Sequence, residues 1–339
     1  MAERVLTQRE LNRATLARQL LLQRARLPVV RAVERVAGLQ AQLGSTPYVG
    51  LWTRLEGFKP QALERALLSR KVSRGLLMRG TVHIVTTRDD ALFGAALDVT
   101  SPAWLTPDDE ETARRVAPSL RAFTAGPRTR AEIFDWLERK HGIVSDGTNR
   151  AWYAMRIRGR IGHSAEASLW RAPIHGPTFS AVEQRDHDGA TARAELVRRY
   201  LAAFGPATRA EIAGWSGLKV RDFADLLDGL VRLRDDRERE LLDVPRAPRP
   251  AADTPAPVRL LPKFDNVLLD RQRVLPEEYR KLVVRKNADV QPTFTVDGYV
   301  AGIWRLEKRR VVTEPFAPLP RVARRELEDE AGRLSAWLG

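Results

Sequence analysis

Residues 123–136 read Phe-Thr-Ala-Gly-Pro-Arg-Thr-Arg-Ala-Glu-Ile-Phe-Asp-Trp, and residues 204–215 read Phe-Gly-Pro-Ala-Thr-Arg-Ala-Glu-Ile-Ala-Gly-Trp. In both stretches a Thr precedes a Glu by three positions. This is the spacing of a capping box, in which the hydroxyl and the carboxylate bind free N–H groups at the start of a helix. Thr7-Gln-Arg-Glu10 is a third such box. Three segments therefore begin a helix in the same physical way, which indicates a repeated unit.

The segment after the last box predicts the rest of the unit. Residues 220–230 carry apolar side chains at helical spacing and predict a second helix. Residues 231–244 predict two short strands around an Asp235-Asp236 turn. A helix, a turn, a helix and a β-hairpin make a winged helix-turn-helix. The middle unit predicts a helix over 152–161 and a strand over 168–171, and the first unit predicts a strand over 80–86.

The connecting and C-terminal segments have signals of their own. Thr106-Pro107 followed by acidic residues predicts the start of a helix that joins the first two units. Five prolines in residues 245–257 predict an extended linker rather than packed structure. Beyond it, residues 293–313 predict strands with a turn at Asp297-Gly298. A final helix is expected from Arg321 to Leu338.

These signals predict an α+β protein of three tandem winged-helix units with a C-terminal β-rich part. The expected divisions are residues 1–115, which include the joining helix, then 116–185 and 186–250, and then 251–339. The last division holds the linker, a β-hairpin and the final helix. A chain of 339 residues is long enough for several such divisions.

Composition limits the kinds of chemistry. The chain has 57 Lys and Arg against 43 Asp and Glu, a net charge of +14, and no cysteine. The positive charge favours a nucleic-acid or anionic partner, although an arginine-rich genome gives the same bias. The lack of cysteine excludes disulfides and thiolate metal sites. The five histidines form no close metal-ligand pair, so we expect neither a metal nor another cofactor.

No stretch of the sequence reads as a signal peptide or as an apolar run of about 18 residues. We therefore expect a cytoplasmic, nucleoid-associated protein that does not enter a membrane.

Gln40 and Gln42 form the most unusual polar pair, one residue apart and just before Gly44-Ser-Thr-Pro47. Residues two apart do not share a helix face, so a joint role requires that the backbone leave helical geometry there. The other interpretation is the polar end of a helix.

Four ordered motifs resemble those of the bacterial winged-helix DNA glycosylases of the AlkZ/YcaQ type. They are Leu39-Gln-Ala-Gln, Met78-Arg-Gly-Thr-Val-His-Ile-Val, Leu261-Pro-Lys-Phe-Asp-Asn-Val-Leu-Leu and Val296-Asp-Gly-Tyr-Val-Ala-Gly-Ile-Trp. The resemblance spans about residues 5–335. It implies three winged-helix units around a C-shaped basic channel. It also implies monofunctional hydrolysis of N7-alkylguanine, including bulky adducts and interstrand crosslinks, in DNA repair or in self-resistance to an alkylating natural product.

The same resemblance suggests roles for individual residues. The family signature is Gln-apolar-Gln, or Gln-apolar-Asp in another branch, so Gln40 and Gln42 match the first form as catalytic residues. The Asp-based version of the mechanism does not carry over. Arg79, Thr81 and His83 lie in a family-like run and are expected near the lesion. For His83 the other interpretation is a structural histidine bonded to the backbone.

Two basic groups are candidates for DNA contact. Arg156, Arg158 and Arg160 alternate with Ile157, Gly159 and Ile161, and on an extended segment all three would face one way. A solvated edge explains them equally well. Lys308, Arg309 and Arg310 would lie at the tip of a hairpin, where the resemblance implies a minor-groove probe. Asp265 could be a catalytic carboxylate, but a turn or cap role is favoured.

The expected partner is double-stranded damaged DNA, bound by a monomer. Two alternatives to an enzyme remain at this stage. One is a winged-helix transcription regulator, which would usually be a dimer that reads a palindrome. The other is a protein that sequesters the lesion without turnover.

Overall fold

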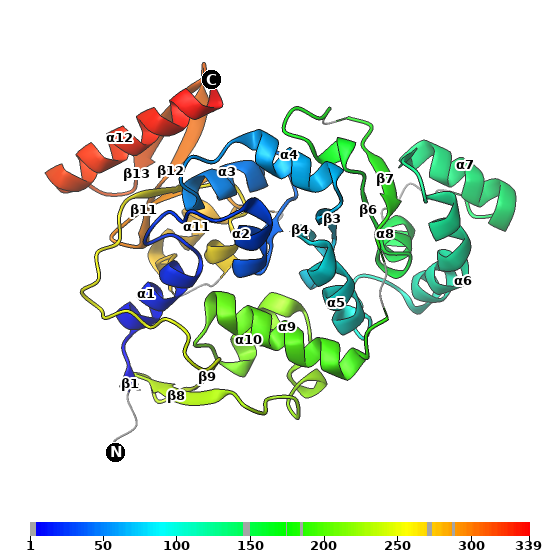
Figure 1. Ribbon diagram of the computed structural model, residues 1–339, viewed down its shortest axis with the longest axis horizontal. Helices are drawn as coiled ribbons and strands as arrows, with labels where there is room; N and C mark the ends of the chain where they lie inside the picture. The colour runs from blue at the N-terminus through cyan, green and yellow to red at the C-terminus, as the bar shows by residue number, and fades with distance from the viewer. Residues whose placement is uncertain (1–4, 145–149, 174, 184–185, 270–272, 287–288) are drawn as a thin grey trace.

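The computed structural model describes residues 5–144, 150–173, 175–183, 186–269, 273–286 and 289–339 (Figure 1). Helices and strands alternate irregularly along the chain, which is the α+β arrangement that the sequence predicts. The α-helices are α1 (Gln8–Arg18), α2 (Val29–Arg35), α3 (Thr46–Arg54), α4 (Pro60–Leu68), α5 (Thr87–Leu97), α6 (Pro107–Phe123), α7 (Arg130–His141), α8 (Arg150–Arg158), α9 (Gly189–Phe204), α10 (Arg209–Ser216), α11 (Arg280–Val283) and α12 (Arg321–Leu338). Short 3-10 turns are η1 (Met78–Gly80), η2 (Glu166–Ser168), η3 (Val220–Asp222), η4 (Asn266–Leu269) and η5 (Glu277–Tyr279).

The predicted helix starts are confirmed. Capping boxes open α1 at Thr7, α7 at Thr129 and α10 at Thr208, each with the Glu three residues later accepting the backbone N–H of the Thr. Thr106 and Asp109 form a further box at the start of α6. These contacts join residues three positions apart, so they form wherever the local sequence provides them.

One six-stranded antiparallel sheet joins the first two predicted units. Its strand order is β2 (Leu39–Gln40), β4 (Val82–Thr86), β3 (Val72–Leu76), β6 (Ile161–His163), β7 (Thr178–Ala181) and β5 (Arg128–Thr129). The two halves of the sheet meet where Arg74 of β3 pairs with His163 of β6. The units are therefore continuous through backbone hydrogen bonds, a long-range link that the local sequence does not predict.

The predicted strand at 168–171 is wrong. The structure has a turn there, with Ser168 donating its hydroxyl to the carbonyl of Ser164 at 2.8 Å and the N–H of Ala167 donating to the Ser164 hydroxyl at 3.2 Å. Ser side chains that bond nearby backbone in this way compete with strand pairing. The strands of this region are β6 and β7 instead.

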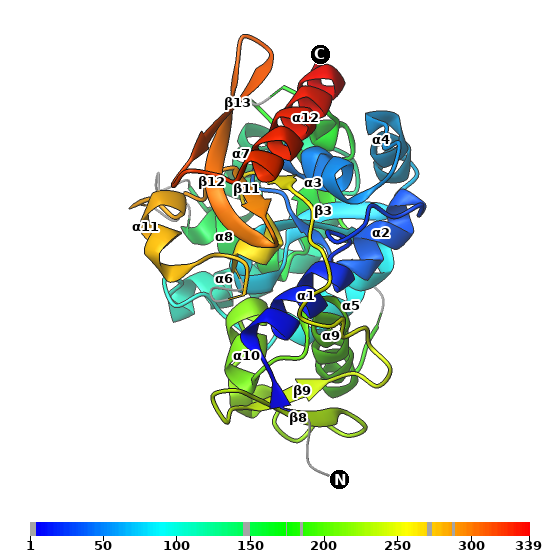
Figure 2. The same ribbon diagram turned by 90° about the vertical axis from the view of Figure 1, so that its left-hand side faces the viewer.

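The N-terminal strand and helix of the described chain pack against the third predicted unit. Strand β1 (Val5–Leu6) pairs in parallel with β8 (Val231–Asp235), which pairs with β9 (Glu240–Asp243), and α1 packs against α9. The predicted hairpin at 231–244 is thus confirmed. Figure 2 shows β1 beside β8 and β9 at one end of the molecule.

The prediction of a second helix for this unit, over residues 220–230, is wrong. Only η3 is helical, because Asp222, Asp225, Asp228 and Gly229 are poor helix formers. The Asp222 carboxylate accepts the N–H of Lys219 at 2.7 Å, and this local bond replaces helix growth.

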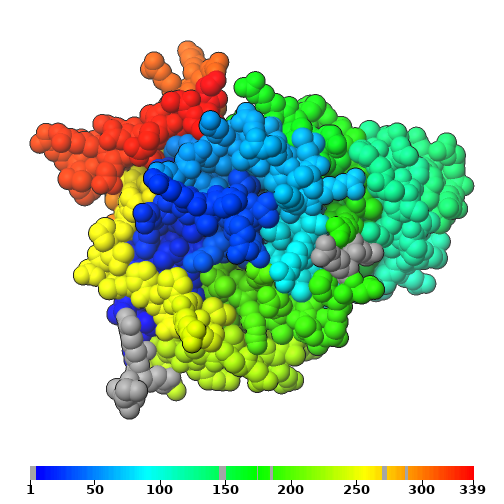
Figure 3. All heavy atoms as spheres, viewed as in Figure 1, coloured from blue at the N-terminus to red at the C-terminus, as the bar shows by residue number. Residues whose placement is uncertain are grey.

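A second, four-stranded sheet forms the C-terminal part. Its order is β10 (Arg259–Leu261), β11 (Thr293–Val296), β12 (Tyr299–Glu307) and β13 (Arg310–Pro315), and α12 packs on β13. The predicted turn at Asp297-Gly298 and the helix from Arg321 to Leu338 are confirmed. The β12–β13 hairpin projects beyond the body of the molecule in both ribbon views (Figures 1 and 2) and at the upper edge of the space-filling view (Figure 3).

The proline-rich segment 245–257 has no regular structure, but it is not a free linker. Three arginines of α1 donate to its carbonyl groups: Arg9 to Ala252 at 2.7 Å, Arg13 to Thr254 at 2.6 Å and Arg18 to Pro248 at 3.2 Å. The prolines supply no N–H of their own, so the segment is held through its acceptors. The prediction that it is unpacked is therefore wrong.

Strands β2, β4 and β3 lie between two apolar cores. Their odd and even residues face opposite sides, as the two-residue strand period requires. Leu39 and Ile84 face a core with α2, α3 and α4, whereas Val85 faces a core with α5 and α9. Within the described residues, no helix is long and apolar enough to cross a membrane.

Candidate functional site

The chain turns sharply before the Gln-Ala-Gln stretch. Helix α2 ends at Arg35, and Gly38 has φ +90°. A Cβ built there would stand 2.6 Å from a methyl carbon of Val85, so only glycine fits between the helix end and β4. The chain then enters β2. Gln40 therefore lies on a strand and not at a helix end, which excludes the other interpretation of its position.

Extended backbone is the geometry in which residues two apart can face the same side. Gln40 is the last residue of β2 and is only 9% exposed, whereas Gln42 lies just beyond the strand and is exposed. The backbone at Gln40 is thus extended and not helical, as a joint role of Gln40 and Gln42 requires. The catalytic assignment of the two glutamines itself stays a prediction.

Gln40 and His83 are direct partners in the antiparallel β2–β4 pair. Side chains of directly opposed residues lie on the same face of a sheet. On this face the Gln40 Oε1 and the His83 Nε2 are both buried, and neither has a hydrogen-bond partner among the described residues. Buried polar atoms are normally paired, so two unpaired atoms on facing residues are a candidate ligand site. We call these two residues, Gln40 and His83, the open face, because each leaves one buried polar atom without a partner among the described residues.

The loop before β4 places two further predicted residues beside this face. Arg79 has φ +56° and donates one guanidinium N–H to the carbonyl of Trp215. Thr81 donates its hydroxyl to the carbonyl of Met78 at 3.0 Å, which closes the loop. Burial lowers the pKa of Arg79 to about 10. The Arg79 Nη2 and the Trp215 Nε1 are buried donors with no partner among the described residues.

His83 is completely buried, and its Nδ1 lies 3.0 Å from the carbonyl oxygen of Thr81. Burial lowers the pKa of its imidazole to about 3, and the positive charge of Arg79 acts in the same direction. The ring is therefore neutral at physiological pH. The backbone contact agrees with the structural interpretation of this residue, but no described residue bonds the other ring nitrogen.

Side chains from distant parts of the chain hold the backbone around Gln40. Asn266 accepts the N–H of Gln40 at 3.2 Å and donates to the carbonyl of Gly38 at 2.8 Å. From the other side, Arg74 donates to the carbonyl of Ala41 at 3.0 Å and to that of Gln42 at 3.4 Å. The sequence reasoning missed both residues. Asn266 lies inside one of the family-like motifs, which is the signal that could have identified it.

Asp265, the neighbour of Asn266, has a structural role. Its two carboxylate oxygens accept from the two Nη atoms of Arg54 at 2.7 and 2.8 Å, and both side chains are fully buried. One oxygen also accepts the N–H of Val267 at 3.2 Å, which is a turn contact. Arg54, Asp265 and Asn266 form what we call the paired cluster.

The extended segment on which Arg156, Arg158 and Arg160 would all face one way is absent, because α8 runs to Arg158, within the region predicted to be helical. Arg156 is buried, and its guanidinium donates to the carbonyl of Ile161 at 3.2 Å. Arg160 forms an ion pair with Asp90. Three guanidinium groups that would face one way in a strand thus point to different internal partners, and the geometry no longer supports a shared row of phosphate contacts.

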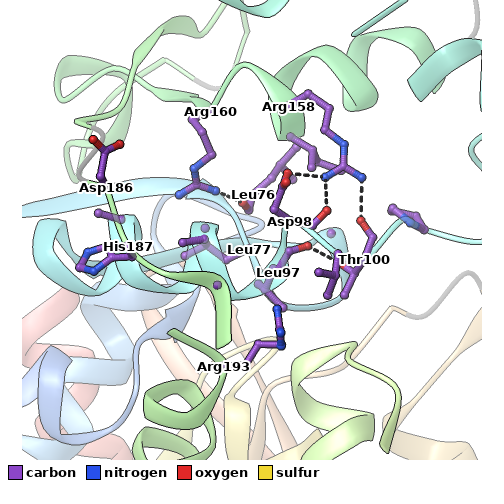
Figure 4. Close-up of a pocket in the computed structure, with 18 residues that line it drawn as sticks. Leu76, Leu77, Leu97, Asp98, Thr100, Arg158, Arg160, Asp186, His187 and Arg193 are labelled. Carbon is purple, nitrogen blue, oxygen red and sulfur yellow. Dashed lines mark hydrogen bonds and ion pairs between the residues drawn. The ribbon is translucent and has the colours of Figure 1, made fainter. Parts of the chain in front are cut away.

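Arg158 and Arg160 line a cavity of about 440 Å³ between α5, α8 and the start of α9. Figure 4 shows Arg158 directed at Asp98 and Thr100, with Arg193 on the opposite wall. Arg158 binds Asp98 at 3.0 Å and Glu110 at 3.0 Å. Its charge is balanced inside the molecule, so the cavity is less basic than its arginine content suggests.

Lys308 and Arg309 occupy the turn between β12 and β13, as predicted, and Arg310 begins β13. All three are exposed, and both turn residues have positive φ. The Arg309 guanidinium donates to the carbonyl of Gly339. This tip belongs to the four-stranded sheet and not to the sheet that carries the open face. Its contact with DNA stays a prediction.

The described residues contain no group of three or more His, Cys, Asp or Glu side chains that could hold a metal ion. The polar groups around β2 and β4 are carboxamide, imidazole, guanidinium and indole groups.

Comparison with known proteins gives three consistent matches. A family model described as "DNA glycosylase AlkZ-like" matches residues 33–337. The interstrand DNA cross-link repair glycosylase of Streptomyces sahachiroi is 25% identical over 352 residues, which cover 95% of this chain and 94% of that protein. The solved structure of the S. sahachiroi DNA glycosylase AlkZ superposes with a TM-score of 0.79 at 21% identity and covers 98% of each chain.

Proposed function

The chain belongs to the AlkZ-like family of DNA glycosylases, and on this premise we propose that it hydrolyses the N-glycosidic bond of N7-alkylguanine in duplex DNA. The substrates include bulky adducts and interstrand crosslinks. The observation that carries this proposal is the pair of glutamines at the end of β2. Gln40 has a buried acceptor with no partner in the part of the chain that the structure describes, and Gln42 is exposed just beyond the strand.

The residues available at this site limit the chemistry. A carboxamide is not basic at neutral pH and cannot supply a proton to a leaving base. It can accept from and donate to a water molecule and hold it beside C1′. Its carbonyl dipole can also stabilise positive charge on the sugar. The substrate must therefore already carry a good leaving group.

N7-alkylguanine meets this requirement. Alkylation at N7 makes the base cationic, so its departure needs no further protonation. Bond cleavage leaves an oxocarbenium-like sugar that captures water, as in glycoside hydrolysis. An oriented carboxamide can help to place that water.

The exposed position of Gln42 supports action on large adducts. Enzymes that read a base in a tight pocket must extrude it completely. A crosslinked guanine cannot be extruded in this way, because it is tied to the opposite strand. Gln42 and the adjacent Leu43, which is 45% exposed, lie on the surface where an unextruded nucleotide could reach them. The curated relative is named for interstrand cross-link repair, which agrees with this proposal.

Release of free base from N7-methylguanine DNA tests the function. We expect the wild-type protein to release N7-methylguanine and leave abasic sites. Gln42→Ala should abolish release while binding to undamaged duplex stays within about twofold of wild type, because the substitution removes no charge that binds phosphate. Gln61→Ala replaces an exposed glutamine on α4 and serves as the matched control. Full activity of Gln42→Ala would refute the site. Tight binding to the lesion without any product would show a sequestering protein.

A further inference from the structure

His83 has a fixed protonation pattern on its two ring nitrogens. Its Nδ1 lies 3.0 Å from the Thr81 carbonyl, which can only accept a hydrogen bond. The proton of the neutral ring must therefore be on Nδ1. The Nε2 consequently presents a lone pair, and that atom is buried with no partner among the described residues.

The residue opposite His83 presents a second acceptor. Gln40 faces His83 across the β2–β4 pair, and its Oε1 is also buried without a partner in the described ranges of the chain. On the other side of β4 the partner of His83 is Gly75, which offers no side chain. Two acceptors cannot bond each other, whereas one water molecule has two protons to donate and satisfies both.

We propose that His83 Nε2 and Gln40 Oε1 together hold the hydrolytic water, and that His83 accepts its proton. This inference rests on the proposed function and assigns to that reaction the base that the glutamines cannot provide. A water that donates both protons to the protein keeps its oxygen lone pairs free for the sugar carbon.

The step balances in atoms and charge. The C1′–N9 bond breaks, and its electron pair goes to N9, which neutralises the cationic base. A lone pair of the water oxygen forms the C1′–O bond, and one of its protons moves to His83 Nε2. The imidazolium keeps its Nδ1–H bond to the Thr81 carbonyl and later returns the extra proton to solvent.

The surroundings of His83 suit a weak base. Arg79 on the preceding loop is the nearby cation that opposes protonation. Across Gly75 lies Asp90 of α5, whose carboxylate is already paired with Arg160. A water that has bonded to an oxocarbenium-like carbon is very acidic, so a weakly basic imidazole can still take its proton. The same weak basicity keeps the ring unprotonated, and ready, at neutral pH.

Two substitutions separate this role from a structural one. In His83→Asn the side-chain amino group occupies the place of Nδ1–H and can keep the bond to Thr81, but no atom reaches the place of Nε2. In His83→Gln the amide oxygen occupies the place of Nε2, but the bond to Thr81 is absent. Asn thus preserves the structural contact, and Gln preserves the acceptor.

Single-turnover release of N7-methylguanine is the first measurement. Removal of a positioned base typically costs about 10²–10⁴-fold in rate, and we expect His83→Asn to fall in this range with wild-type thermal stability and DNA affinity. His83→Gln should retain more activity than His83→Asn, because it still accepts from the water, although it is less stable. Wild-type release by His83→Asn would overturn the proposal while leaving the proposed function intact.

The pH profile is a second readout. The pKa of His83 is lowered to about 3 by burial and by Arg79, so the neutral ring persists at every higher pH. The wild-type release rate should therefore be level from about pH 9 to about pH 5, well above that pKa. A fall with a midpoint near the ordinary histidine pKa of about 6.5 would contradict this expectation.

Nitrogen NMR of the histidines in the DNA-free protein tests the water site without any turnover. We expect Nδ1 to be protonated and Nε2 to be unprotonated but hydrogen-bonded, with shifts that stay constant across neutral pH. In Gln40→Met the Nε2 shift should move toward that of a free lone pair. A free Nε2 in the wild-type protein would overturn the proposal even if no DNA substrate were cleaved.

Discussion

The open face and the paired cluster both bury polar groups, and Asn266 connects them, but the two regions treat those groups differently. In the paired cluster, both carboxylate oxygens of Asp265 bind Arg54, and Asn266 binds the backbone at Gln40 and Gly38. On the open face, Gln40 and His83 each leave one buried acceptor without a partner among the described residues. Paired groups define a backbone conformation, whereas unpaired groups cost stability and indicate where a ligand binds.

The largest effect on stability is expected from breaking the paired cluster. Asp265→Asn leaves the fully buried Arg54 without its counter-charge, which should lower the free energy of unfolding by about 3–5 kcal/mol. Urea denaturation measures this. Glu56→Gln, which removes the partner of exposed Arg26, is the matched control and should change nothing measurable. An equally small effect of both variants would mean that the buried pair does not stabilise the fold.

The open face should respond in the opposite way. Gln40→Met keeps the length of the side chain but removes the unpaired acceptor. The unfolding free energy should stay constant or rise, because an unsatisfied buried oxygen is removed. The base-release rate should fall by about 10²–10³-fold, which is the size of effect seen when one preorganised polar group is removed from an active site. If Gln40→Met is destabilised yet fully active, Gln40 supports the fold and not the reaction, which contradicts the contrast drawn with the paired cluster.

Substitution of Asn266 should lower both the unfolding free energy and the base-release rate, each by less than in the variants above. Asn266→Ala leaves the Gln40 N–H and the Gly38 carbonyl unpaired, at a cost of about 1–3 kcal/mol in unfolding free energy. The release rate should fall about tenfold, because the strand that carries Gln40 is less well positioned. Asn266→Asp keeps the acceptor for Gln40 and should recover part of the rate. If Asn266→Ala releases base from bound DNA at the wild-type rate, Asn266 stabilises the fold but does not position Gln40 for the reaction.

The smallest effect is expected at the hairpin tip, far along the chain from the open face. Replacing Lys308, Arg309 and Arg310 by Ala should weaken binding to all duplexes. The slope of log binding constant against log salt concentration should become shallower by about 0.9 for each phosphate that is no longer neutralised. Fluorescence anisotropy at several salt concentrations measures this. Arg158→Ala is the control, because the Arg158 charge is already balanced by Asp98 and Glu110 and its removal should leave the slope unchanged. Equal slopes for wild type and the triple variant would remove the tip from the DNA interface.

Short-range signals in the sequence determined much of the fold. The capping boxes at Thr7, Thr129 and Thr208, the turn at Asp297-Gly298 and the helix from Arg321 to Leu338 all form as predicted. Each depends on residues within a few positions of one another, so the local sequence contains all the information that is needed. The predicted helix over 220–230 failed because apolar spacing does not outweigh three aspartates and a glycine.

The sequence also singled out Gln40, Gln42 and His83, and the family resemblance suggested what they do. It could not show that Gln40 and His83 face each other, because strand pairing joins residues far apart in the chain through long-range packing. Nor could it show that Asn266, 226 positions from Gln40, holds the strand in place. The identity of the polar groups is a property of the sequence. Which of them are paired and which are left open is decided only when distant segments are packed into one structure, because burial is what makes a missing partner costly.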